Sequence, residues 1–177
     1  MSIRKLTTLA MFTTLAIIIF TIESAIPPFI PIPGIKLGLS NIITIVIFKL
    51  YSPKDAFFVL FTRILLSTFL FGQAMSLLYS LVGGVFCFLA MYLVNRLLQK
   101  HFLYLTGVVG ALFHNLGQLT VAYLLTSVPG VLTYLPFLLL SGLLTGLFTG
   151  LCAHFSIKYL LPSVIPPPSS PKEDGDN

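Results

Sequence analysis

The sequence predicts an all-α, polytopic membrane protein, and its composition and apolar segments lead to that prediction. Of the 177 residues, 56% are hydrophobic and only 8% are charged, whereas a soluble domain carries about a quarter charged residues. The mean hydropathy is +1.01. A helix needs about 20 apolar residues to cross a bilayer, and the chain up to residue 161 holds roughly six such segments. We therefore expect a bundle of six transmembrane helices.

The first three helices are expected at 6–25, 37–51 and 53–71. The first is an apolar run that ends before a stretch of prolines; a cleaved signal peptide is the alternative, although this run is longer than a usual signal core. The second begins after Gly34 and is short, so we expect it to be oblique or partly broken. Pro53 suits the first turn of the third helix, where its missing N–H leaves no hydrogen bond unmade.

The last three helices are expected at 74–98, 102–126 and 132–161, with Pro129 and Gly130 preceding the sixth. Residues 162–177 are rich in proline and serine and then acidic, which is typical of a disordered segment. The sequence therefore predicts one transmembrane domain, 1–161, and a cytoplasmic tail, 162–177.

The basic residues orient the predicted bundle. With the N-terminus inside, most of them fall at the inner ends of helices, whereas Lys36 alone falls at the outer side. Cytoplasmic ends of membrane proteins carry the excess of lysine and arginine. This distribution predicts a protein of the cell membrane with cytoplasmic N- and C-termini. The residues assigned to the inner side are Arg4, Lys5, Lys49, Lys54, Arg96, Lys100 and Lys158, with Lys172 in the tail.

Several function classes are excluded by what the sequence lacks. The net charge is +5, but the basic residues do not form a stripe with stacking aromatics, so nucleic acid is not an expected partner. No phosphate-binding loop or dinucleotide-binding glycine motif is present. Cys87 and Cys152 lie in separate apolar segments, and no cysteine and histidine group has metal-ligand spacing. We expect no metal and no cofactor.

Small residues recur at spacing four along several segments. Gly142, Gly146 and Gly150 mark such a face on the sixth segment, and Ala10 and Thr14 mark a shorter one on the first. Small residues let membrane helices approach closely. Each face can serve a helix of the same chain or a neighbouring subunit, and the sequence leaves both open.

Arg63 lies in the middle of the apolar third segment. A cation at the centre of a bilayer costs roughly 2.5 kcal/mol or more, and such residues usually mark a functional site. Three interpretations stay open: backbone carbonyls satisfy the guanidinium, the side chain reaches the interface, or it binds an anionic or polar group of a ligand. The third is the expectation that we carry forward.

Two further groups of polar residues are candidates for the same ligand site. His114 and Gln118 share one face of the fifth segment, and Asn115 lies beside them. They serve either a ligand cavity or hydrogen bonds between helices. Lys36 and Asn41 lie at the start of the second segment, where backbone donors can receive an anion. This stretch is either part of the site or an ordinary turn.

Glu23, near the outer end of the first segment, can pair with Lys36, contact a ligand, or remain solvated.

Five motifs, in this order, resemble the Gx transporter family, whose members are often labelled heptaprenyl diphosphate synthase component I. The resemblance covers nearly all of the chain to about residue 161. The motifs are PGIKLGLSN at 33–41, RILL at 63–66, GG at 83–84, HNLGQL at 114–119 and SGLLTG at 141–146.

The family is similar to the substrate-binding S components of energy-coupling factor (ECF) transporters. That similarity implies six helices, a pocket that opens outward, and a loop between the first two helices that covers it. It also implies a coupling membrane subunit and two cytoplasmic ATPases as partners. S components meet the coupling subunit through small residues on helix one, which here are Ala10 and Thr14, with threonine where a second alanine is typical.

We expect a membrane-embedded, S-component-like subunit that binds a small anionic or amphipathic ligand for uptake. Arg63 would receive the anion, His114, Asn115 and Gln118 would hydrogen-bond the ligand, and the loop over 31–36 would close the pocket. One alternative is an accessory membrane subunit of heptaprenyl diphosphate or quinone metabolism; another is a membrane subunit of flavin-based extracellular electron transfer. The chain is not expected to be an enzyme itself, because Asp55 is its only aspartate before the tail and a prenyl diphosphate synthase needs several.

Overall fold

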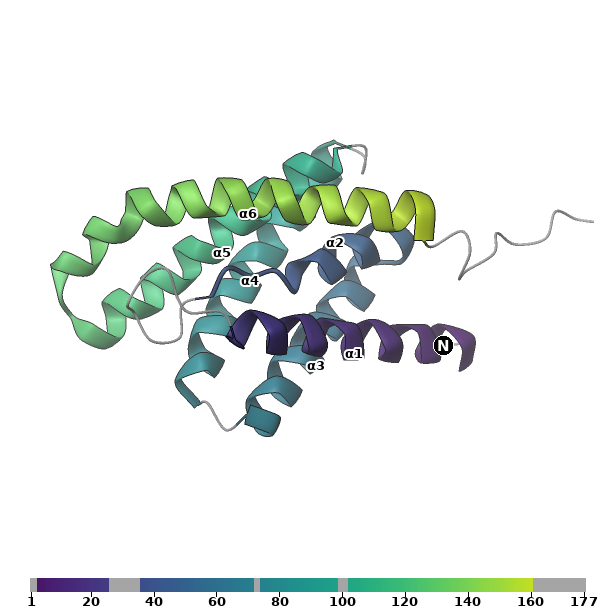
Figure 1. Cartoon of the computed structure of the whole chain (residues 1–177), viewed down its shortest axis with the longest axis horizontal. Helices are drawn as coiled ribbons and strands as arrows, with labels where there is room; N and C mark the ends of the chain where they lie inside the picture. Colours follow the sequence, from purple (N-terminus) through teal and green to yellow (C-terminus); the bar gives the residue numbers. More distant parts are fainter. Residues whose placement is uncertain (1–2, 26–35, 72–73, 99–101, 161–177) are drawn as a thin grey trace, which may run out of the picture.

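The computed structural model describes residues 3–25, 36–71, 74–98 and 102–160, and every regular element in these ranges is helical (Figure 1). The predicted all-α class is therefore confirmed. A short 3-10 helix, η1, precedes the last long helix, and a π-helical turn, η2, follows it. The elements are α1 (Ile3–Ala25), α2 (Asn41–Leu50), α3 (Pro53–Phe71), α4 (Ala74–Leu97), α5 (Leu103–Thr126), η1 (Pro129–Tyr134), α6 (Leu135–Phe155) and η2 (Ser156–Leu160).

Four helical stretches of the described residues are long and apolar enough to cross a membrane. They are α1, α4, α5 and the continuous stretch Pro129–Tyr159 that contains α6. The 19 residues of α3 include Lys54, Asp55 and Arg63, and α2 has only ten residues. At 1.5 Å per residue, α2 is about 15 Å long, half of a bilayer core. The chain is thus a multi-pass membrane protein, and the count of six spans stays a prediction.

The predicted and observed bounds agree within one residue for α3, α4 and α5. The first helix begins at Ile3 instead of residue 6, and α6 spans Leu135–Phe155, continued by η2 to Leu160, instead of 132–161. The largest difference at a helix start is at α2. This helix begins at Asn41 instead of residue 37. The reason is Gly38, whose φ of +79° lies in the left-handed region that only glycine adopts without strain. Residues 36–40 therefore form a non-helical segment, which we call the entry segment, ahead of α2.

The short helix α2 lies inside the bundle. Ile45, Ile47 and Phe48 are at most 1% exposed, and buried residues occur on every side of the helix. A helix that is hydrophobic all round belongs in a core. Its neighbours in the main core cluster come from all five of the other α-helices. The entry segment is consequently anchored at the start of an enclosed helix.

The helix α5 packs against α6 through the glycines at spacing four on α6. A Cβ atom added to Gly146 would lie 2.5 Å from Val108 Cα, and one added to Gly150 would lie 2.8 Å from Tyr104 Cα. On its other side, α5 meets α4 where a Cβ on Gly117 would lie 2.8 Å from Gly83 Cα. The small-residue face of α6 therefore serves a helix of the same chain.

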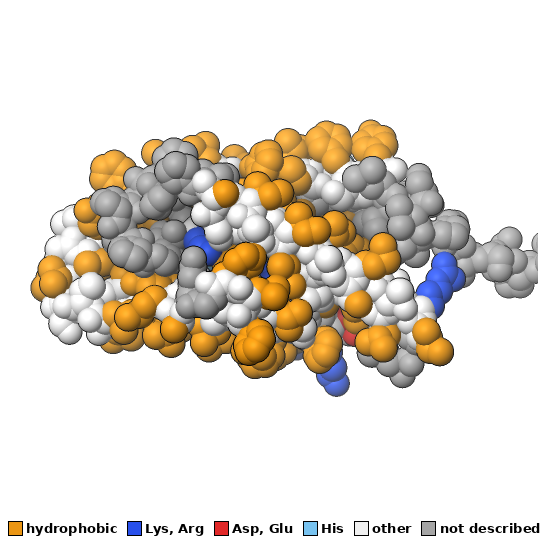
Figure 2. All heavy atoms as spheres, turned by 60° about the horizontal axis from the view of Figure 1, so that its bottom comes forward, with side chains coloured by type: hydrophobic (Ala, Val, Ile, Leu, Met, Phe, Trp, Pro, Cys, Tyr) orange, Lys and Arg blue, Asp and Glu red, His pale blue; other side chains and the backbone are white. Residues whose placement is uncertain are grey.

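Large hydrophobic side chains cover the outside of the molecule. Figure 2 shows them spread over the face in view, with few charged side chains between them. Phe69 is 91% exposed, and Leu70 and Phe137 are exposed by 63% and 66%. Soluble monomers rarely expose contiguous apolar patches of more than a few hundred Å². This surface fits a hydrocarbon environment.

The start of α1 and the end of α6 lie at the same end of the molecule (Figure 1). Near this end the Lys5 ammonium lies 2.8 Å from the Asp55 carboxylate, which ties α1 to α3. Asp55 also accepts hydrogen bonds from the backbone N–H and the hydroxyl of Ser52, so it caps the start of α3. Asp55 is therefore engaged in structural contacts on both sides.

Candidate functional site

A buried polar cluster lies where the entry segment meets α1, α3 and α5. It joins Glu23 of α1, Arg63 of α3, and His114 and Gln118 of α5 to residues 36–41. These four side chains are at most 5% exposed. Buried polar groups in a membrane protein need partners and usually mark a site. We call this group of residues the polar cluster.

Arg63 donates a short hydrogen bond from Nη1 to the hydroxyl of Ser40, the residue that precedes α2. Its guanidinium carbon lies 5.9 Å from the centre of the Phe20 ring, within range of a cation–π attraction. Within the described ranges, no backbone carbonyl accepts a hydrogen bond from Arg63. Since a guanidinium has five N–H donors, Ser40 alone does not saturate it.

Glu23 is buried rather than solvated. Its two carboxylate oxygens accept hydrogen bonds from consecutive backbone N–H groups, Gly38 at 2.6 Å and Leu39 at 2.9 Å. Glu23 also interacts electrostatically with Arg63 and Lys36, although neither cation comes within ion-pair distance of it in the described part of the chain. The end of α1 therefore brings a carboxylate near Arg63, but its oxygens are bound to backbone N–H groups.

Both the side chain and the backbone of Lys36 make contacts in the structure. Its ammonium donates to the Ser24 hydroxyl at 2.7 Å and lies 3.6 Å from the centre of the Phe20 ring. Burial lowers the pKa of Lys36 to about 8; Glu23 opposes this shift and the positive charge of Arg63 adds to it. The ammonium is thus charged at neutral pH but easily neutralised.

Gln118 connects α5 to the entry segment. With its amide oriented to satisfy both neighbours, it donates to the Lys36 carbonyl at 3.0 Å and accepts from the Lys36 N–H at 3.2 Å. The same amide oxygen accepts from His114 Nε2 at 3.1 Å. This arrangement places the histidine proton on Nε2 and leaves Nδ1 as an acceptor.

Three polar atoms at the centre of the polar cluster have no hydrogen-bond partner among the described residues. They are both amide atoms of Asn41 and Nδ1 of His114, which lies near the Gly83 backbone without hydrogen-bond geometry. Asn41 is 2% exposed and His114 is 4% exposed. Both side chains lie against Gly38, because a Cβ there would be 2.8 Å from Asn41 Nδ2 and 3.0 Å from His114 Cδ2. An unsatisfied buried polar group costs about 1–3 kcal/mol, so these atoms point to a ligand or water.

Asn115 is placed on another side of α5. Its amide donates to the Leu138 carbonyl at 2.7 Å and to the Ser141 hydroxyl at 3.3 Å. It therefore joins α5 to α6 rather than joining the polar cluster, and its oxygen has no partner among the described residues. Ala10 and Thr14, expected at a partner interface, lie on the exposed face of α1.

Sequence reasoning found most members of the polar cluster but missed two of their partners. Ser40, which holds Arg63, and Ser24, which holds Lys36, are short hydroxyl residues without a distinguishing pattern. The expected covering loop over 31–36 lies outside the described residues except for Lys36. Gly38 is the sequence feature that could have indicated the Glu23 contact, because glycine permits the backbone geometry that presents two N–H groups to this carboxylate.

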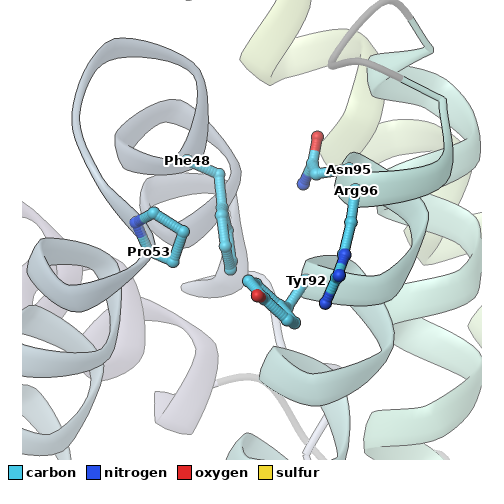
Figure 3. Close-up of a pocket in the computed structure, with 5 residues that line it drawn as sticks. All are labelled: Phe48, Pro53, Tyr92, Asn95 and Arg96. Atoms are coloured by element: carbon cyan, nitrogen blue, oxygen red, sulfur yellow. The ribbon is translucent and has the colours of Figure 1, made fainter.

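A separate hollow of about 220 Å³ lies between α2, the start of α3 and the end of α4. Figure 3 shows its five lining residues: Phe48, Pro53, Tyr92, Asn95 and Arg96. Asn95 already donates to the Met91 carbonyl, and none of the lining residues carries an unpartnered buried polar atom. The polar cluster is therefore the stronger candidate site.

Comparison with known proteins gives a family. A search of the curated proteins and a search of the solved structures each found no match. A family model described as heptaprenyl diphosphate synthase component I matches residues 12–156, which covers most of the chain and all members of the polar cluster. The chain therefore belongs to the heptaprenyl diphosphate synthase component I family.

Proposed function

We propose that this protein is the membrane-embedded, ligand-binding subunit of a small-molecule uptake transporter, similar to the S components of ECF transporters. One observation carries the proposal. Arg63 is buried in a multi-helix membrane bundle. Close to it, both amide atoms of Asn41 and Nδ1 of His114 lack hydrogen-bond partners among the described residues. A fully structural cluster would satisfy such atoms, whereas a binding site leaves them for its ligand.

The charges of the polar cluster favour an anionic or amphipathic ligand. Arg63 and protonated Lys36 exceed the single carboxylate of Glu23 by one positive charge. Asn41 offers a further donor and acceptor, and His114 Nδ1 offers an acceptor. Phe20 adds an apolar wall beside both cations. A molecule with one anionic group and an apolar body matches this set.

The site cannot drive active uptake by itself, because the sequence has no phosphate-binding loop for ATP. The proposal therefore includes a coupling membrane subunit and cytoplasmic ATPases. Ala10 and Thr14 are proposed to contact the coupling subunit, since they lie on the exposed face of α1. The cell membrane is the proposed location, with both termini in the cytoplasm.

Native mass spectrometry of the detergent-purified protein tests the ligand site. We expect a small molecule to remain bound to the wild-type protein and to be lost from Arg63→Ala. Arg96→Ala is the matched control, because Arg96 lies outside the polar cluster and beside the separate hollow. Equal retention of the molecule by Arg63→Ala and wild type would reject the site.

Co-purification tests the transporter assembly. We expect the tagged protein to retain a coupling subunit and ATPases, and to lose them when Ala10→Leu and Thr14→Leu are combined. Met11→Ala on the same exposed region of α1 is the control, because it adds no bulk. Absence of any ATPase from the wild-type complex would argue against active uptake.

The family description supports a second candidate function, an accessory membrane subunit of heptaprenyl diphosphate or quinone metabolism. In that role the protein would present an amphipathic molecule to a separate synthase. It would not catalyse the reaction itself, because Asp55 is the only aspartate before the tail and already binds Lys5 and Ser52. A stable complex with a soluble prenyl synthase, with loss of long-chain product on deletion, would favour this function over transport.

A further inference from the structure

The entry segment presents a backbone anion site, and Glu23 fills it. Two consecutive N–H groups, those of Gly38 and Leu39, each donate to one oxygen of the Glu23 carboxylate. Consecutive N–H groups at a left-handed residue form a concavity that binds anions. Gly38 has this conformation, with φ of +79°. The geometry is that of an oxyanion held by two backbone donors.

More hydrogen-bond donors lie around this concavity than the Glu23 carboxylate uses. The Asn41 side chain, buried and without a partner for either amide atom among the described residues, lies against Gly38. Arg63 interacts electrostatically with Glu23 but donates its hydrogen bond to Ser40. Two strong donor groups thus lie beside a carboxylate that they do not bind directly.

We propose that Glu23 is a built-in occupant of the ligand's anion site, and that the ligand's oxyanion replaces it on the Gly38 and Leu39 N–H groups. This inference rests on the proposed function of the polar cluster. In the exchanged state the ligand oxyanion also receives the Asn41 amide and the free donors of Arg63. The ligand class is a singly charged oxyanion, a carboxylate or phosphodiester, because one such charge neutralises the excess positive charge of the cluster.

Lys36 gives the displaced carboxylate a place to go. Its ammonium is held next to the end of α1 by Ser24 and already interacts electrostatically with Glu23. Movement of the Glu23 side chain toward Lys36 would replace its two backbone hydrogen bonds by an ion pair. The exchange therefore needs no charge to be left alone in the bundle.

Chemical rescue of Glu23→Ala tests the anion site directly, with the full chain in detergent. Removing the carboxylate leaves two buried N–H donors unpaired, so the melting temperature falls. We expect sodium formate to restore most of this loss, with sodium chloride at equal ionic strength having no such effect. Asp55→Ala is the matched control: Asp55 accepts two hydrogen bonds from Ser52 and also pairs with Lys5, but it lies near the other end of the molecule.

Absence of formate rescue in Glu23→Ala, or equal rescue of Asp55→Ala, would overturn the proposal.

Glu23→Gln provides a second test if the alanine variant does not fold. It keeps the size of the side chain but removes the competing charge, so formate should bind about tenfold more tightly than to wild type. Unchanged formate affinity would overturn the exchange of Glu23, while loss of the native ligand from Arg63→Ala would still support the proposed function. Retention of that ligand by Arg63→Ala would reject the proposed function whatever the formate result.

Nanodiscs with and without phosphatidylglycerol then distinguish a lipid phosphodiester from a free anion. If the ligand is an anion from the aqueous phase, Glu23→Gln should have the same melting temperature in both kinds of nanodisc. If it is a lipid headgroup, the melting temperature should be higher in nanodiscs with phosphatidylglycerol. Either result supports the exchange when formate also binds, because both place an oxyanion on the same donors.

Discussion

Arg63 uses only a small part of its hydrogen-bonding capacity within the described part of the bundle. Its one hydrogen bond among the described residues goes to Ser40, and its electrostatic partner Glu23 is bound to backbone N–H groups instead. Buried arginines in structural roles are usually saturated with acceptors, since an unpaired buried charge is costly. The partial satisfaction of Arg63 is the residue-scale reason to assign it to a ligand.

Ser40→Ala tests how much the hydroxyl supports Arg63. Hydrogen bonds to charged groups contribute about 1.5–3 kcal/mol, so we expect a loss of unfolding free energy of about this size. Ligand binding should weaken as well, because the guanidinium loses its orientation. Unfolding by denaturing detergent measures the first effect. Thr7→Ala is the control, since its exposed hydroxyl bonds only to the carbonyl one turn earlier; equal losses for the two variants would contradict the expectation.

Lys36 predicts a pH dependence of stability. Its pKa is lowered from 10.5 to about 8 in the folded protein, chiefly by burial. The unfolded chain therefore binds more protons than the folded one between these values, and stability contributed by this group rises with pH across that window. We expect unfolding free energy to increase from pH 8 toward pH 10 in wild type, with a smaller increase in Lys36→Met. Parallel pH profiles for the two proteins would show that Lys36 is not buried as described.

At the scale of elements, the short length of α2 and the close packing of α5 against α6 have different physical causes. The helix α2 has only ten residues, because the left-handed conformation of Gly38 and its hydrogen bond to Glu23 keep residues 36–40 out of the helix. The α5–α6 contact is close because Gly107, Gly146 and Gly150 face backbone of the neighbouring helix. Without these glycines the helices would separate, and the hydrogen bond from Asn115 to the Leu138 carbonyl would be lost.

Gly146→Ala should therefore be destabilising although alanine is the better helix former. Its Cβ would lie 2.5 Å from Val108 Cα, and backbone cannot move aside as a flexible side chain does. Overpacking of this kind costs typically about 1–3 kcal/mol. Gly130→Ala is the matched control, because the nearest atom there, Val128 Cγ1, is 3.6 Å away. Thermal unfolding of both variants in detergent measures the difference; equal melting temperatures would mean that the close approach is not needed.

The molecule as a whole has the apolar surface of a membrane protein, and the polar cluster lies buried in its interior. Exposed phenylalanine and leucine side chains cover the helices, while the polar cluster is enclosed by α1, α3 and α5. The Lys5–Asp55 pair and the start of α1 mark one end of the bundle. From the distribution of basic residues we expect that end to lie in the cytoplasm.

Reporter fusions test this orientation. Green fluorescent protein fused after residue 161 should fluoresce, because the predicted C-terminus is cytoplasmic. Alkaline phosphatase fused after Ser127, between α5 and η1, should be active, because this turn is expected outside. Fluorescence and phosphatase activity at the opposite positions would reverse the assignment, and with it the outward side of the polar cluster.

The sequence by itself determined the helical membrane class, the limits of most helices and the identity of Arg63, His114 and Gln118 as unusual residues. Composition and hydrophobic segments carry this information, because hydrocarbon admits only long apolar helices with satisfied backbones. The glycine spacing of α6 also predicted close packing, since small residues are needed wherever membrane helices touch.

Only the tertiary structure decided which polar groups meet. The residue partners are far apart in the chain: Glu23 with Gly38 and Leu39, and Ser40 with Arg63. Periodicity assigns residues to a face of one helix, but the rotation and depth of that helix depend on its neighbours. The glycine contacts of α5 set both, and they turn Asn115 toward α6 while His114 and Gln118 face the entry segment. That is the physical reason why adjacent residues of one sequence motif take different roles.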